Sequence, residues 1–151
     1  MQRFFYRLKQ VVGYVIWIMV GLSTACGGST AAPQPKFLLG DVFTIGMGET
    51  AVIESENLTV TFDSVIGDYR CPSQVNCAEE GQAEGVITIQ QSEGEPVALE
   101  FNTNSSPDLN RQSFVFGDYV VDLQSLDPYP QEPDKPIEVE TYRVTLVITK
   151  P

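Results

Sequence analysis

The chain has 151 residues, with 20 acidic against nine basic residues and no histidine. The absence of histidine removes the commonest general base and the Ser-His and Cys-His nucleophile pairs. Residues 26–151 contain all 20 acids and only six basic residues, which gives them a formal charge near −14. Such a surface cannot gain affinity for nucleic acid by releasing counterions from phosphates, so we predict no nucleic-acid partner.

The N-terminus has the pattern of an export signal. Basic residues Arg3, Arg7 and Lys9 precede the apolar run VVGYVIWIMVGL at 11–22. This run of 12 residues suits the hydrophobic region of a signal peptide, and a membrane-spanning helix needs about 20 residues. We therefore expect residues 1–25 to be a signal peptide and the rest of the chain to lie outside the cytoplasm.

The expected signal peptide ends at a cysteine. The segment LSTAC at 22–26 resembles a bacterial lipobox, in which a signal peptidase cuts before a cysteine that carries a diacylglyceryl group. The usual pattern has leucine three positions before the cysteine, whereas Ser23 stands there and Leu22 lies one position further back. The resemblance implies cleavage before Cys26 and several acyl chains on it, which give stable membrane anchoring. The alternative is an ordinary secretory signal with a free Cys26.

The remaining sequence divides into a short tether and one domain. GGSTAAPQPK at 27–36 is small, polar and proline-containing, so we expect residues 26–36 to be a flexible tether. Residues 37–151 have the length of one domain, which can bury a core without many disulfides. The expected location is the extracytoplasmic side of the cell envelope, with contact to the membrane through the lipid on Cys26.

Alternation of apolar and polar residues predicts strands throughout this domain. In the segment 57–65, for example, Leu58, Val60 and Phe62 share one face. The expected strands lie within 41–48, 50–54, 57–65, 85–91 and 97–101, with two more within 113–126 and a last one within 141–149. Alternation of this kind is typical of antiparallel sheets with one face on a core. We predict an all-β, antiparallel two-sheet β-sandwich of about eight strands, with a small β-barrel as the alternative.

Cys71 and Cys77 lie in a polar loop between two expected strands. A zinc site normally has four ligands, or three with a water, and a thioredoxin-type redox motif has two residues between its cysteines. Here five residues separate the cysteines, and the chain has no histidine. Because disulfides persist in exported domains, we predict a Cys71–Cys77 disulfide worth roughly 2–2.5 kcal/mol. We call residues 71–77 the stapled loop.

Five residues around the stapled loop and the later proline-rich loop DPYPQEPDKP (127–136) are candidate binding residues. They are Tyr69, Glu79, Glu80, Glu84 and Tyr129. The alternatives are a solvated loop for the acids and packing on its own turn for each tyrosine. Calcium is the ion that such acids could bind, because it prefers oxygen ligands. No D-x-D-x-D-G spacing occurs, so we predict no metal or cofactor site.

Four segments share a pattern with other sequences. They are DYRCPSQVNC at 68–77, the G-x-A at 81–83, DPYP at 127–130 and YRVTLVIT at 142–149. They resemble a group of small uncharacterised exported bacterial proteins with D-S-R-C-P-x-x-V-x-C, then W-A-G, a P-Y-P-like loop and a last Y-x-V-T-L strand. This chain has Tyr69 in place of the serine and Glu79-Glu80-Gly81 in place of W-A-G. The resemblance supports the fold and the disulfide and implies no activity.

Together these observations favour a lipid-anchored, extracytoplasmic β-sandwich module without catalytic activity. We expect it to bind an envelope protein or polymer, or to add structure to the cell envelope. The sequence contains no G-x-S-x-G and no phosphate-binding glycine loop. Two alternatives stay open. One is an inhibitor of an envelope hydrolase that acts through the stapled loop, and the other is a hydrolase that uses paired carboxylates.

Overall fold

The structure is a computed structural model that describes residues 33–104, 106 and 111–151. The expected signal peptide, the lipidation residue Cys26 and the first part of the tether lie outside these residues. Within the part of the chain that is described, no helix combines the length and the hydropathy of a membrane span.

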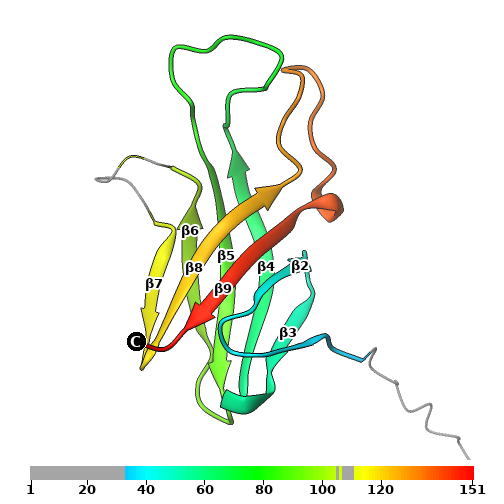
Figure 1. The fold of residues 1–151 in the computed structure, drawn as a ribbon. Helices are drawn as coiled ribbons and strands as arrows, with labels where there is room; N and C mark the ends of the chain where they lie inside the picture. The colour runs from blue at the N-terminus through cyan, green and yellow to red at the C-terminus, as the bar shows by residue number, and fades with distance from the viewer. Residues whose placement is uncertain (1–32, 105, 107–110) are drawn as a thin grey trace, which may run out of the picture. The chain divides into compact units, whose positions relative to one another are not determined.

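The described residues form nine strands (Figure 1). They are β1 (Lys36–Phe37), β2 (Val42–Gly46), β3 (Thr50–Ile53), β4 (Leu58–Asp68), β5 (Ala83–Gln91), β6 (Val97–Asn102), β7 (Ser113–Phe116), β8 (Tyr119–Asp127) and β9 (Arg143–Thr149). Two short 3-10 helices, η1 (Glu54–Glu56) and η2 (Val139–Thr141), follow β3 and precede β9. Strands β2 to β9 are the eight that alternation predicts. The two-residue β1 was not predicted, because two residues cannot show alternation.

The strands build two sheets that pack face to face. One sheet has the order β1-β3-β4-β5-β6 and the other the order β2-β9-β8-β7. All neighbours are antiparallel except β1, which pairs with β3 in parallel and begins at Lys36, the last residue of the expected tether. Neither sheet closes on itself, so the predicted β-sandwich is confirmed over the alternative barrel.

The core consists of the inward positions of both sheets. Leu58, Val60 and Phe62 of β4 are fully buried, while the threonines between them are only half-buried. The facing sheet contributes the same pattern from β9, with Val144, Leu146 and Ile148. The alternation of 97–101 places Val97 on the same face as Leu99 and Phe101 and so predicts that it points inward, but Val97 is exposed. It pairs with buried Ile89 and so lies on the expected face, but it begins an edge strand at the rim of the core.

Strand β4 runs three residues further than alternation predicts. Its pairing with β5 is irregular between Phe62 and Ser64 and again between Val65 and Gly67. Each such bulge adds a residue on one strand and shifts the inward and outward positions, so the period of two is lost after Phe62. The longer β4 and β8 carry two loops to the same end of the sandwich, where the stapled loop (green) and the proline-rich loop (orange) meet (Figure 1).

Candidate functional site

Arg70 joins the two loops at this end of the sandwich. Its Nε donates to Asp68 Oδ1 at 2.8 Å and its Nη2 donates to Asp68 Oδ2 at 2.6 Å, which makes a bidentate ion pair. Nη1 donates to the carbonyl oxygen of Leu126 at 2.6 Å, and Nη2 also donates to that of Pro128 at 2.9 Å. Only 5% of the Arg70 side chain is exposed, so these charge-assisted hydrogen bonds form away from water.

Two tyrosines surround this ion pair. The Tyr142 hydroxyl donates to Asp68 Oδ2 at 2.9 Å. The Tyr129 ring lies against the guanidinium, with 4.9 Å between Arg70 Cζ and the ring centroid. The Tyr129 hydroxyl donates to the Cys71 carbonyl oxygen at 2.9 Å. We call Asp68, Arg70, Tyr129 and Tyr142 the loop junction, because they connect β4, both loops and the start of β9.

Asp68 and Tyr142 have fixed protonation states near neutral pH. Burial alone would raise the pKa of Asp68, but the hydrogen bonds and charge of Arg70, with the Tyr142 hydroxyl, hold the pKa of this carboxyl below its usual value. Burial, followed by the neighbouring Asp68 carboxylate, raises the pKa of Tyr142 to about 12. Asp68 therefore remains an ionised acceptor and Tyr142 a neutral donor, which suits a permanent linkage and not a proton transfer.

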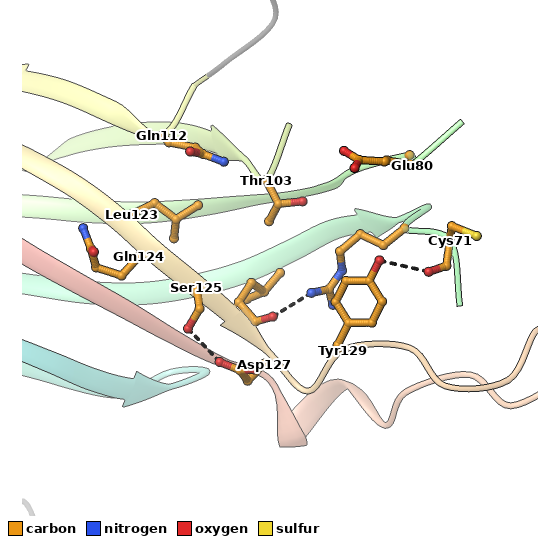
Figure 2. A pocket seen from close by; sticks show the side chains of 12 residues that line it. Cys71, Glu80, Thr103, Gln112, Leu123, Gln124, Ser125, Asp127 and Tyr129 are labelled. Atoms are coloured by element: carbon orange, nitrogen blue, oxygen red, sulfur yellow. Dashed lines mark hydrogen bonds between the residues drawn. The ribbon is translucent and has the colours of Figure 1, made fainter. Parts of the chain in front are cut away.

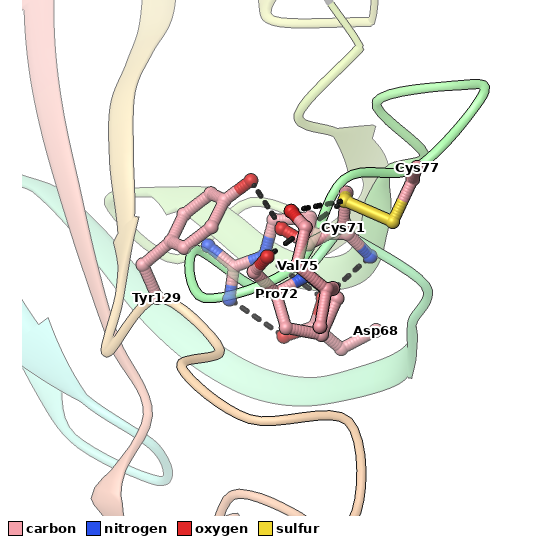
Figure 3. The surroundings of a disulfide bond; sticks show 7 residues. Asp68, Cys71, Pro72, Val75, Cys77 and Tyr129 are labelled. Atoms are coloured by element: carbon pink, nitrogen blue, oxygen red, sulfur yellow. Dashed lines mark hydrogen bonds and ion pairs between the residues drawn. A yellow bond between two sulfur atoms is a disulfide. The ribbon is translucent and has the colours of Figure 1, made fainter.

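The predicted disulfide between Cys71 and Cys77 is confirmed (Figure 3). The two Cα atoms are 5.9 Å apart, across six positions in the sequence. Within the loop, the Val75 backbone N–H donates to the Pro72 carbonyl oxygen at 3.2 Å. The stapled loop is thus closed by a covalent bond and supported by an internal turn.

The stapled loop is also paired with the proline-rich loop along the backbone. The N–H groups of Ser73 and Gln74 donate to the carbonyl oxygens of Pro130 and Gln131, at 3.0 and 3.1 Å. The Ser73 hydroxyl donates to the Gln131 side-chain oxygen at 2.8 Å. The two loops therefore form one continuous surface, and the loop junction connects this surface to the ends of the strands.

Gly81 closes the base of the stapled loop. It has φ +66°, and a Cβ atom there would lie 1.9 Å from the Tyr69 carbonyl oxygen. On either side of it, Cys71 N–H donates to the Glu80 carbonyl oxygen at 2.7 Å and Tyr69 N–H donates to that of Gln82 at 2.8 Å. Only glycine allows this approach of the two backbones, which explains the G-x-A element in physical terms.

A hollow of about 390 Å³ lies between the loop junction and β8 (Figure 2). Glu80 and Gly81 line it from the stapled-loop side, and Ser125 and Asp127 line it from β8. The Ser125 hydroxyl donates to Asp127 Oδ2 at 2.7 Å. The hollow contains two carboxylates, but no three metal-ligating side chains come together anywhere in the described residues.

The structure separates Glu84 from the other two candidate acids. Glu79 and Glu80 lie on the exposed loop, and Glu84 is half-buried in β5, where it accepts a hydrogen bond from Gln82 Nε2 at 2.5 Å. Glu80 lines the hollow beside Arg70, and a second hollow brings Glu79 and Glu80 together with Tyr69. Glu84 lines a third hollow, beside Glu100. The three acids therefore do not line one common site.

The two candidate tyrosines have different surroundings. Tyr129 belongs to the loop junction, so its ring and hydroxyl both have partners within the protein. Tyr69 is 72% exposed, and its ring lies over Gly67, where a Cβ atom would meet ring atoms at 2.7 Å. Tyr69 thus offers an aromatic surface to a partner, and Tyr129 supports the loops.

Removal of the disulfide is expected to weaken the domain without unfolding it. Changing Cys71 and Cys77 together to serine should lower the free energy of unfolding by roughly 2 kcal/mol, since the closed loop is short and keeps its backbone pairing. Urea denaturation followed by circular dichroism measures the change. Free thiols in the exported wild-type protein, found by alkylation without reductant, would contradict the disulfide.

The site was only partly visible in the sequence. The cysteines, Tyr69 and Tyr129 were recognised, but the roles of Asp68, Arg70 and Tyr142 were not. The D-x-R spacing before Cys71 was the one available signal. Comparisons with protein-family models, with curated proteins and with solved structures gave no significant match.

Proposed function

We propose that the protein is a lipid-anchored, extracytoplasmic module of the cell envelope that binds a partner protein through the loop end of its sandwich and has no catalytic role. One observation carries this proposal. The buried Arg70 side chain connects the base of the stapled loop to two carbonyl groups at the end of β8. Two loops that are distant in the sequence are thereby fixed as one surface.

A fixed surface of this kind is suited to binding. Ordering a mobile loop on association costs free energy, and a loop that is already held in place avoids this cost. The surface exposes the aromatic Tyr69, a residue type enriched among those that dominate the energy of protein interfaces, and the apolar Val75. The disulfide and the loop junction thus have a common purpose, which is to present these side chains in one geometry.

The polar groups of the loop junction support a non-catalytic role. The Arg70 guanidinium is directed at Asp68 and at backbone carbonyl groups, and the Tyr142 hydroxyl is directed at Asp68. Their hydrogen bonds join parts of the protein to one another, as expected of a structural support. A catalytic arrangement would instead direct such groups at an open position where a substrate atom could lie.

An inhibitor of an envelope hydrolase is a special form of this proposal. The shape of the stapled loop favours it, because the loop is short, covalently closed and located at the extreme end of the domain (Figure 1). A rigid, projecting loop with the exposed Val75 could enter the active-site cleft of an enzyme.

The anchor is tested by the substitution Cys26→Ser. We expect this variant to lose incorporation of a fatty-acid analogue and to leave the membrane fraction, because it lacks the acylated thiol and keeps the apolar run. The matched control is the double variant Cys71→Ser with Cys77→Ser, which removes two other cysteines and should stay labelled and membrane-bound. Equal labelling of the wild type and the Cys26→Ser variant would contradict lipid anchoring through Cys26.

The binding surface is tested by photo-cross-linking in intact cells. A photoreactive amino acid at position 75 is expected to give a discrete adduct with one partner protein. The control position is 115, because Val115 on β7 is 77% exposed and lies away from the loop end. No adduct from position 75, or the same adducts from both positions, would contradict a binding role for the loop end.

A further inference from the structure

Strand β4 has an unpaired edge where it passes the end of β3. The pairing of β3 with β4 ends at Thr61, and the preceding turn bonds only Phe62, through Glu49 and Gly48. Beyond Phe62, β4 continues to Asp68 with β5 on one side (Figure 1). On its other side, no backbone hydrogen bond from any described residue reaches positions 63–68.

Some of the backbone groups of this edge are directed away from β5, toward the open side. In an antiparallel ladder, successive residues direct their N–H and C=O groups to alternate sides of the strand. The Tyr69 N–H donates to Gln82 on the β5 side, so the backbone groups of Asp68 face the open side. An unpaired edge of this kind can accept an extended peptide through main-chain hydrogen bonds.

An apolar groove of about 730 Å³ runs along this edge. One wall is the end of β4, with Ile66 and Tyr69, and the other is the proline-rich loop and η2, with Pro133, Pro136 and Val139. Ile66 and Val139 are 56% and 55% exposed, one on each wall. The groove therefore offers apolar contacts for side chains directly beside backbone groups that lack a partner strand.

Charge determines what can occupy the groove. The described residues contain six basic side chains, and each lies within 3.9 Å of a carboxylate of the same chain. These include Lys135, which lines the groove and pairs with Glu132. With a formal charge near −14, a second copy of the chain would be repelled, and a basic segment would be attracted and steered to the surface.

The bulge in β4 also argues against pairing between two copies. It interrupts the strand between Val65 and Gly67, so two β4 edges could not form a long regular ladder. A short peptide segment needs only a few consecutive hydrogen bonds and can adapt to the bulge. The edge is thus better suited to a flexible partner segment than to a rigid strand of another folded copy.

We propose that an extended, basic segment of a partner protein adds to the open edge of β4 as a further strand and places its apolar side chains in the groove. The inference rests on the proposed function as a binding module and names the chemistry of the partner. Main-chain hydrogen bonds to 63–68 hold the segment, the groove between Ile66 and Val139 accepts its apolar side chains, and its positive charge complements the acidic domain.

The test is hydrogen–deuterium exchange of the detergent-solubilised full chain, with and without an octapeptide of alternating lysine and valine. We expect the peptide to slow exchange several-fold at those amides within 63–68 that face the open side, Asp68 among them, and to leave β6, an edge strand of the same sheet, unchanged. Two control peptides should give no protection. One has glutamate in place of lysine, and the other keeps lysine but has N-methyl groups on alternate backbone nitrogens.

Paired variants distinguish an effect on the groove from an effect of net charge on peptide binding. Ile66→Arg places a cation in the groove, and we expect it to weaken peptide binding about tenfold or more. Val115→Arg adds the same charge at an exposed valine of β7 and should bind as the wild type does. If Ile66→Arg melts at a lower temperature than the wild type, Val139→Arg on the opposite wall repeats the test.

Three results with the peptides and variants would overturn the inference. They are no protection at 63–68, equal protection by a control peptide, and equal weakening by Ile66→Arg and Val115→Arg. Protection of 63–68 that rises with protein concentration in the absence of peptide would assign the edge to a second copy and would also overturn it. The test uses purified protein in detergent, so its outcome does not depend on whether Cys26 is lipidated. If position 75 gives a cross-linked adduct but the peptide does not protect 63–68, the proposed binding function stands and only the addition of a strand to β4 is rejected.

Discussion

Replacing Arg70 with alanine is expected to lower the free energy of unfolding by roughly 3–5 kcal/mol. The substitution leaves the Asp68 carboxylate, whose side chain is only 10% exposed, without its cation and removes the bonds to two carbonyl groups at the end of β8. Urea denaturation followed by circular dichroism measures the loss. Arg111→Ala is the control, because Arg111 and Glu100 form an ion pair with 64% and 66% of their side chains exposed. The control should lose less than about 1 kcal/mol.

The effect of Arg70→Ala should also depend on pH. In the wild type the pKa of Asp68 is below its usual value, so this carboxylate stabilises the fold above the ordinary aspartate pKa. That stability is lost as the pH falls through the lower, folded-state pKa. Without Arg70, burial raises the pKa of Asp68. Protonation of this carboxyl group then removes the unpaired charge that destabilises the variant. The difference between the two proteins should therefore begin to narrow above the ordinary aspartate pKa, where Asp68 of the variant protonates, and go on narrowing below it, where Asp68 of the wild type protonates. A constant difference would contradict the role of the ion pair.

Gly81→Ala is expected to be the second most damaging of these substitutions, with a loss of about 2–4 kcal/mol. The new Cβ atom would meet the Tyr69 carbonyl oxygen at 1.9 Å, and neither backbone can move without breaking the bonds that close the stapled loop. Gly117→Ala is the matched control. Gly117 also has a positive φ, +57°, but nothing lies within 4 Å of a Cβ atom there, so strain alone should cost about 1 kcal/mol. Equal losses would show that the close approach at Gly81 is unimportant.

The fold could be predicted because each strand has one face on the core. This arrangement imposes a period of two on the sequence, as in Leu58, Val60 and Phe62, and each such segment was assigned correctly. The prediction failed where the physical cause of the period is absent. The bulges in β4 shift the register after Phe62, and Val97 lies at an edge where its inward face has little to cover it.

The site was less predictable because its main contacts are long-range and involve the backbone. The disulfide joins two cysteines only six positions apart, and composition alone indicates it. Arg70 instead meets the carbonyl groups of Leu126 and Pro128, which are 56 and 58 positions away. Every residue has a carbonyl group, so nothing in the sequence marks these two as acceptors. Likewise, the open edge of β4 follows from the different lengths of β3 and β4 and has no sequence pattern of its own.

The loop junction has a consequence for how the surface above it can vary. Many of the bonds that hold the two loops are accepted by main-chain carbonyl oxygens, among them those of Leu126, Pro128 and Cys71. Because such acceptors do not depend on the side chain, exposed positions such as Tyr69 and Val75 can change without disturbing the support. The loop end is therefore open to diversification, much as an engineered scaffold tolerates grafted loops. Two chains that share Asp68, Arg70 and both cysteines could recognise different partners.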